Sequence, residues 1–82
     1  MQTTRYFEEQ VLRKRPYIQR KWCEQAIAAP VRRIIQADGR QRLWVRVQVE
    51  GEGKHYMLRV VTLEDGLTIQ NAFFDSGYRE DG

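Results

Sequence analysis

Residues 40–49 read RQRLWVRVQV, and this stretch decides the fold that the sequence predicts. Leucine and valine occupy positions 43, 45, 47 and 49, while arginine, tryptophan, arginine and glutamine occupy positions 42, 44, 46 and 48. An alternation with a period of two predicts a β-strand that buries one side and exposes the other. Two arginines flanking an indole on the exposed side are suited to hold a phosphate backbone and a stacked base. The plainer alternative is a solvated strand whose arginines lie over Trp44.

The length of 82 residues predicts one domain, 1–82, with one small core. A hydrophobic content of 41% and a charged content of 30% fit a folded protein and not a disordered one. The single cysteine, Cys23, permits no internal disulfide and no zinc site made of thiolates, so we expect a reducing compartment such as the cytoplasm. Neither an apolar signal core after Met1 nor a run of 18 apolar residues is present, and we expect no membrane partner.

Charge is distributed unevenly along the chain. Residues 1–48 contain eleven Lys and Arg against four Asp and Glu, a net charge of +7, whereas residues 49–82 contain three against seven, a net charge of −4. This asymmetry favours an anionic partner on one side, with nucleic acid as the first candidate, and a separate basic partner on the other. Alternatively, neighbouring strands neutralise one another and the asymmetry has no functional meaning.

Two helices are predicted before the strand. Apolar residues recur at helical spacing over residues 4–15, and Pro16 ends this segment because the residue before a proline avoids the α region. A second amphipathic helix is expected over about residues 18–29, closed by Pro30. Cys23 borders its apolar stripe and is expected to be a buried or half-buried side chain.

Four strands are predicted after the helices, over about residues 31–36, 40–49, 54–63 and 67–74. Asp38-Gly39, residues 51–53 and Asp65-Gly66 provide the tight turns between them, which require antiparallel neighbours. The predicted fold class is therefore α+β, with two N-terminal helices packed on a four-stranded antiparallel sheet (ααββββ) and a flexible tail over residues 76–82. The helices cover one face of the sheet and leave the other uncovered; we call the latter the open face.

The register of the last hairpin decides which side chains share the open face. A two-residue turn at Asp65-Gly66 predicts the pairs Leu58 with Phe73, Arg59 with Ala72, Val60 with Asn71, Val61 with Gln70 and Thr62 with Ile69. This register assigns Phe73 and Asn71 to the helix side, and it assigns to the open face Arg42, Trp44, Arg46, His55, Arg59 and Gln70. Val61 and Leu63 share the open face, so we expect either cover by the tail or a protein-binding surface.

These residue types suit cleavage of RNA without a metal. Such cleavage requires removal of a proton from the 2′-hydroxyl, stabilisation of the phosphate and protonation of the leaving oxygen. His55 is a candidate acid or base, although an exposed loop histidine is the plainer alternative. Arg59 and Arg46 are candidates to hold the phosphate, but Arg59 could instead balance Asp75, Glu50 or Glu64. No glycine-rich phosphate loop and no paired histidines at ligand spacing occur, so no metal or cofactor is expected.

Two segments carry a resemblance to known proteins. Tyr56-Met57-Leu58-Arg59-Val60-Val61, a turn and Leu67-Thr68-Ile69 resemble the last hairpin of the RelE/ParE superfamily of small bacterial toxins. The two helices, Arg15-Pro16-Tyr17-Ile18 between them, Pro30 and Asp38-Gly39-Arg40 are similar to small uncharacterised domains grouped near the BrnT-type and RelE-type toxins. The chain departs from many of these domains at Tyr6-Phe7, where they have a histidine and a small residue.

The resemblance implies a RelE-like fold and a metal-independent endoribonuclease of a type II toxin-antitoxin system, acting on free or ribosome-bound mRNA. In such a protein Arg59 would stabilise the phosphate, His55 and Arg46 would assist, and Tyr78 or Arg79 would act at the end of the last strand. Residues expected to position the RNA are Arg40, Arg42, Trp44, Gln70 and Arg79. An antitoxin with an acidic segment is the implied protein partner, and the free protein is expected to be a monomer or weak dimer. The open alternative is a non-catalytic module that binds RNA or protein on the same scaffold.

Overall fold

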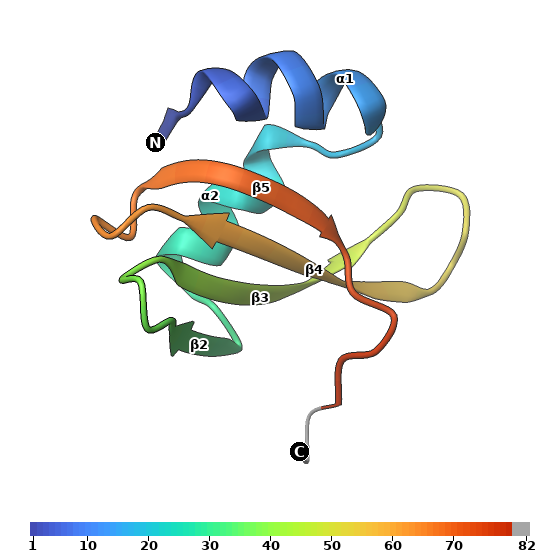
Figure 1. Cartoon of the computed structure of the whole chain (residues 1–82). Coiled ribbons are helices and arrows are strands. Elements are labelled where there is room, and N and C mark those ends of the chain that lie inside the picture. The colour runs from blue at the N-terminus through green and yellow to red at the C-terminus, as the bar shows by residue number, and fades with distance from the viewer. Residues whose placement is uncertain (80–82) are drawn as a thin grey trace.

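One sheet of five strands organises residues 1–79, which are the residues that the computed structural model describes (Figure 1). The strands are β1 (Gln2–Thr3), β2 (Arg32–Ile35), β3 (Gln41–Gln48), β4 (His55–Thr62) and β5 (Thr68–Phe74), and their order in the sheet is β1-β5-β4-β3-β2. Strands β2 to β5 pair antiparallel in chain order, as the alternating pattern and the tight turns predict. The predicted α+β class is confirmed.

The prediction of a four-stranded, wholly antiparallel sheet is wrong at one edge. Strand β1 pairs parallel with β5, with Gln2 opposite Thr68 and Thr3 opposite Ile69, so the sheet is mixed. The backbone N–H of Thr4 extends this pairing by donating to the carbonyl of Ile69 at 2.9 Å. Two residues are too few to show a period of two, which is why the sequence pattern gave no sign of this strand.

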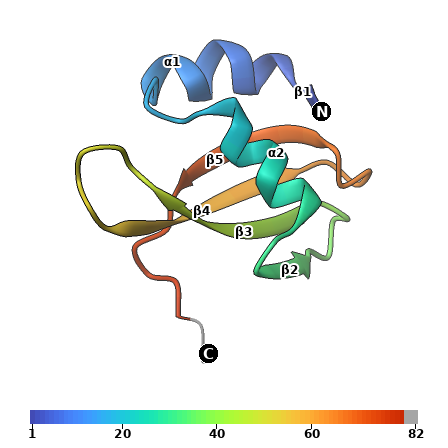
Figure 2. The same ribbon diagram turned by 180° about the vertical axis from the view of Figure 1, so that it is seen from behind.

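The two predicted helices are present but end earlier than expected. The first contains a π-helical turn, η1 (Phe7–Val11), followed by α1 (Leu12–Lys14), and the Thr4 hydroxyl accepts a hydrogen bond from the Phe7 N–H at its start. The second is α2 (Arg20–Ala28), which crosses one face of the sheet (Figure 2). No helix among residues 1–79 is long and apolar enough to cross a membrane.

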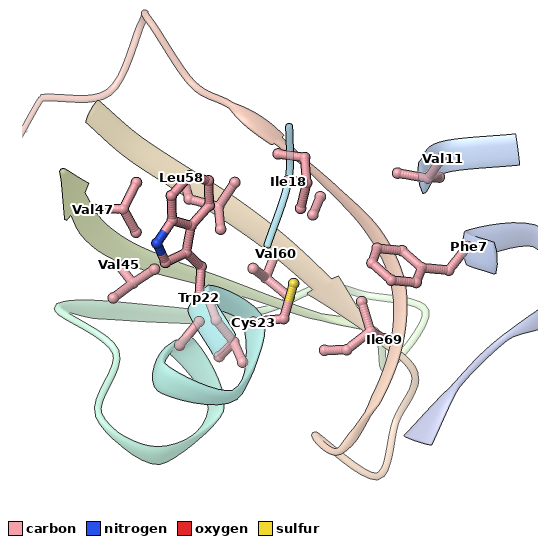
Figure 3. Packing of buried hydrophobic residues seen from close by; sticks show 13 residues of the cluster. Phe7, Val11, Ile18, Trp22, Cys23, Val45, Val47, Leu58, Val60 and Ile69 are labelled. Atoms are coloured by element: carbon pink, nitrogen blue, oxygen red, sulfur yellow. The ribbon is translucent and has the colours of Figure 1, made fainter. Parts of the chain in front are cut away.

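The hydrophobic core fills the space between the helices and one face of the sheet (Figure 3). Helix α2 packs on β3 and β4, and η1 packs on β5. Burial raises the pKa of the Cys23 thiol to about 11, so this side chain behaves as a small protonated core residue. The fully or nearly fully buried members of the core are Phe7, Val11, Ile18, Trp22, Cys23, Ala26, Leu43, Val45, Val47, Leu58, Val60, Ile69 and Ala72.

A β-bulge at Gln70 changes the predicted register of the last hairpin. Thr62 lies opposite Ile69, as predicted, but Val61 lies opposite Asn71 and leaves Gln70 unpaired. The remaining pairs shift by one residue, to Val60 with Ala72, Arg59 with Phe73 and Leu58 with Phe74. Side chains alternate along a strand, so one extra residue moves every later side chain of β5 to the opposite face of the sheet.

Two predictions about individual residues are corrected by this bulge. Phe73 is not a core residue on the helix side, because it lies opposite Arg59 and is half-buried on the open face. Asn71 is likewise on the open face, and its side-chain oxygen accepts a hydrogen bond from the N–H of Ala72 at 2.9 Å. Phe74 takes the place on the helix side that was predicted for Phe73.

Replacing Leu58 with alanine should lower the free energy of unfolding by about 3 kcal/mol, because the side chain is fully buried between the sheet and the helices. Urea denaturation followed by circular dichroism measures this change. Ile35→Ala is the matched control, since Ile35 is 65% exposed on the edge strand β2 and its truncation should cost less than about 0.5 kcal/mol. Equal losses in the two variants would contradict the arrangement of the core.

Candidate nucleic-acid interface

The pairing of β3 with β4 brings most of the predicted site residues to the open face. Trp44 lies opposite Arg59, Gln48 lies opposite His55, and Arg46 lies opposite Met57. Paired residues of neighbouring strands project to the same side of a sheet, and the core takes the intervening residues on the other side. The same pairing gives the open face its predicted members Arg42, Trp44, Arg46, His55 and Arg59.

Three other predicted contact residues have different positions. Gln70 is the unpaired residue of the bulge, so it is not part of the paired rows of the open face. Arg40 lies in the turn before β3, where its N–H donates to the carboxylate of Asp38 and its guanidinium lies 3.8 Å from the same carboxylate. Arg79 is an exposed residue beyond the last strand.

Arg59 is held between two aromatic rings. Its guanidinium carbon lies 5.7 Å from the ring centre of Trp44 and 5.1 Å from that of Phe73. The Asp75 carboxylate lies 4.0 Å from the Nη1 atom, with 24% of the arginine side chain and 18% of the aspartate side chain exposed. Asp75 is thus one of the carboxylates that the sequence offered to balance the charge of Arg59. The two aromatic rings restrict the orientation of the guanidinium group.

The electrostatic environment of Arg59 disfavours its charge. Burial lowers the pKa of its guanidinium, the nearby Arg42 lowers it further, and Asp75 opposes both effects. The Nε atom of Arg59 is buried and has no hydrogen-bond partner among residues 1–79. An anion that contacts the exposed part of the guanidinium would offset the two lowering effects.

The tail after β5 folds over Trp44. The indole N–H donates to the Asp75 carboxylate at 2.9 Å, and the Tyr78 ring packs on the indole with centroids 5.7 Å apart. Trp44 is consequently only 5% exposed, and Tyr78 covers the indole that was predicted to stack a base. Tyr78 is the residue of the predicted flexible tail that packs on the sheet, and residues 80–82 of that tail lie outside the described residues.

His55 and Tyr78 line the same cavity. Its volume is about 320 Å³, and its other lining residues are Tyr56, Met57, Phe74, Asp75 and Ser76. His55 and Arg59 are four residues apart on β4, which separates their Cα atoms by about 13 Å. Arg46, opposite Met57, lies between these two residues and is therefore better placed than Arg59 to act beside His55.

Some residues of this surface were not predicted. Arg32 lies opposite Trp44 on β2, with its guanidinium carbon 5.9 Å from the indole centre, and Arg15 approaches Phe73 at 6.0 Å. Residues 32–35 read RRII and do not alternate between polar and apolar, so the pattern gave no signal for the side on which Arg32 lies. Arg15 follows the first helix and reaches Phe73 only because of the tertiary fold.

The site was also compared with the requirements of a metal site, and the chain with known proteins. Among residues 1–79 no group of three or more histidine, cysteine, aspartate or glutamate side chains is arranged to hold a metal ion. Comparison of the chain with models of known families, with curated proteins and with solved structures finds no significant match.

Asp75→Ala should release the tail from Trp44, because it removes the acceptor of the indole N–H in a half-buried setting. We expect the Trp44 indole proton to exchange with solvent about tenfold faster, as measured by hydrogen-exchange NMR, while Trp22 stays unchanged. Glu64→Ala, with the same change in net charge on an exposed turn, should leave the Trp44 exchange rate as it is. Equal protection of Trp44 in the wild type and in Asp75→Ala would contradict this role of the carboxylate.

Proposed function

We propose that this protein binds single-stranded RNA across the open face of its sheet. The observation that carries the proposal is the guanidinium of Arg59, which lies between Trp44 and Phe73 while 24% of the side chain remains exposed. A partly exposed guanidinium in a cationic, aromatic setting is suited to an RNA phosphate, which brings both a negative charge and acceptor oxygens.

The surroundings of Arg59 extend this cationic surface along the sheet. Arg32, Arg42 and Arg46 come from neighbouring positions on β2 and β3, and their pairing partners lie on the open face. A broad sheet surface with aromatic side chains suits single-stranded RNA, because its unpaired bases can stack on the rings. Duplex RNA suits such a surface less well, because its bases are paired and its major groove is deep and narrow. Bases would stack on Phe73 and Tyr78, whose rings are half-exposed, while the buried Trp44 supports them.

Binding of fluorescein-labelled single-stranded RNA, followed by anisotropy, tests the proposal. Arg46→Gln and Arg59→Gln should each weaken binding and lower the slope of log affinity against log salt by about 0.7 per lost phosphate contact. Asp75→Asn should tighten binding, because it removes the carboxylate that competes with phosphate for Arg59. Arg13→Gln, an exposed arginine on α1, is the control for net charge. An equal loss in Arg13→Gln, or no saturable binding of RNA, would contradict the proposal.

A second candidate function is metal-independent cleavage of RNA by a RelE-like toxin fold. The specific observation in its favour is the cavity that His55 and Tyr78 share beside Asp75. In this proposal His55 takes the proton from the 2′-hydroxyl, Tyr78 protonates the leaving oxygen, and Arg46 and Arg59 stabilise the phosphate. An antitoxin with an acidic segment would cover the open face by charge complementarity.

Cleavage of single-stranded RNA in the presence of EDTA tests this second candidate. His55→Gln and Tyr78→Phe should each slow cleavage by about 100-fold or more, the usual cost of losing a general acid or base. Gln48→Ala, opposite His55, is the matched control and should cleave normally. In cells, induced expression should arrest growth, and Arg59→Ala should abolish the arrest. Intact RNA together with salt-dependent binding would leave RNA binding as the function and exclude cleavage.

A further inference from the structure

A second surface, on the helix side of the sheet, contains a pocket that RNA binding does not use. Its volume is about 460 Å³, and it lies between the connection of the two helices, the start of α2, the start of β4, the end of β5, and the turn from β3 to β4. Figures 1 and 2 show that this turn and the helix connection lie at the same end of the molecule. The lining residues are Tyr17, Gln19, Trp22, Val49, Glu50, Glu52, Tyr56 and Phe74.

Four aromatic rings form the wall of this pocket. Phe74 is stacked between Tyr17 and Tyr56, with centroid distances of 5.5 and 5.0 Å and an interplanar angle of 25° in both pairs. Trp22 packs on Phe74 at 6.0 Å with its plane tilted by 46°. Tyr17 remains 52% exposed although it belongs to this cluster, so part of an ordered aromatic wall faces solvent.

Two carboxylates give the pocket a negative charge. Glu50 and Glu52 line it, and a Glu52 oxygen accepts a hydrogen bond from the Tyr56 hydroxyl at 2.5 Å. This bond to a carboxylate raises the pKa of the Tyr56 hydroxyl. The ammonium group of Lys54 lies 5.5 Å from the centre of the Tyr56 ring, so a cation from this chain already uses one of these rings.

We propose that this pocket binds an arginine side chain from a basic segment of a partner protein. A guanidinium group is planar and weakly hydrated, stacks on aromatic rings and binds carboxylates through a fork of N–H donors. Aromatic walls with Glu50 and Glu52 meet each of these requirements. An anionic ligand would be repelled by the two carboxylates, and a purely apolar ligand would gain nothing from them.

The pocket is separate from the arginine-rich rows of the open face, although it shares Tyr56 and Phe74 with the cavity that His55 and Tyr78 line. Tyr56 and Phe74 pack against the core on the helix side, whereas Arg59 and Phe73 belong to the open face. The inference therefore does not depend on RNA binding, and Glu50 and Glu52 can be replaced without changing a residue of the open face or of the His55–Tyr78 cavity. The charge of the pocket is also opposite to that of the arginine-rich sheet surface.

Titration with the capped peptide acetyl-Gly-Arg-Gly-amide, followed by amide chemical shifts in NMR spectra, tests the proposal. We expect saturable shifts confined to residues near 17–22, 49–56 and 74. Glu50→Gln combined with Glu52→Gln should weaken binding about tenfold or more through the loss of charge-assisted hydrogen bonds. Lys54→Ala should tighten binding about threefold, because it removes the cation of this chain that competes for the Tyr56 ring.

The control variant combines Glu24→Gln with Glu64→Gln, two exposed glutamates outside the pocket, and should bind the peptide as the wild type does. The spectrum of each free variant reports whether it is folded. Several results would overturn the proposal: equal affinity for the citrulline or lysine counterpart of the peptide, shifts on the open face only, unchanged affinity in the Glu50 and Glu52 variant, or no saturable shifts.

Discussion

The antiparallel pairing of β3 with β4 determines which side chains of this protein can act together. It places Leu43, Val45 and Val47 beside Val60, Leu58 and Tyr56 on the helix side, where the core forms. The same hydrogen bonds then require Trp44 and Arg59 to share the opposite face. Burial of the apolar row therefore fixes the cationic row as well, since a slip of one residue would expose the core.

On the open face, the cluster of Trp44, Arg59, Asp75 and Tyr78 stabilises the fold but does not fully compensate the charge of Arg59. Asp75 accepts a hydrogen bond from the Trp44 indole N–H and lies near Arg59, and the Tyr78 ring packs on the indole. These contacts stabilise the folded tail, yet burial and Arg42 still lower the pKa of Arg59. The partly exposed guanidinium, whose charge burial and Arg42 disfavour, is the feature that points to an anionic ligand.

The sequence predicts the central strands, their turns and most of the open face because each depends on local pattern. Alternation identifies β3, and Asp38-Gly39 and Asp65-Gly66 occur where turns are observed, with Gly39 and Gly66 at positive φ. The tail over Trp44 and the strand β1 depend on contacts between distant segments, which local pattern does not encode. The bulge at Gln70 is a backbone irregularity without a distinctive residue, so the predicted register failed there.

The bulge has consequences for both proposed sites, because it sets the orientation of two adjacent phenylalanines. Without the extra residue, Phe73 would project to the helix side and Ala72 would lie opposite Arg59. With it, Phe73 forms one wall of the Arg59 sandwich, and Phe74 stacks between Tyr17 and Tyr56 in the acidic pocket. One unpaired residue in β5 thus supplies an aromatic ring to a cationic surface and another to an anionic surface. The two surfaces are therefore structurally linked through the same strand, although their ligands are of opposite charge.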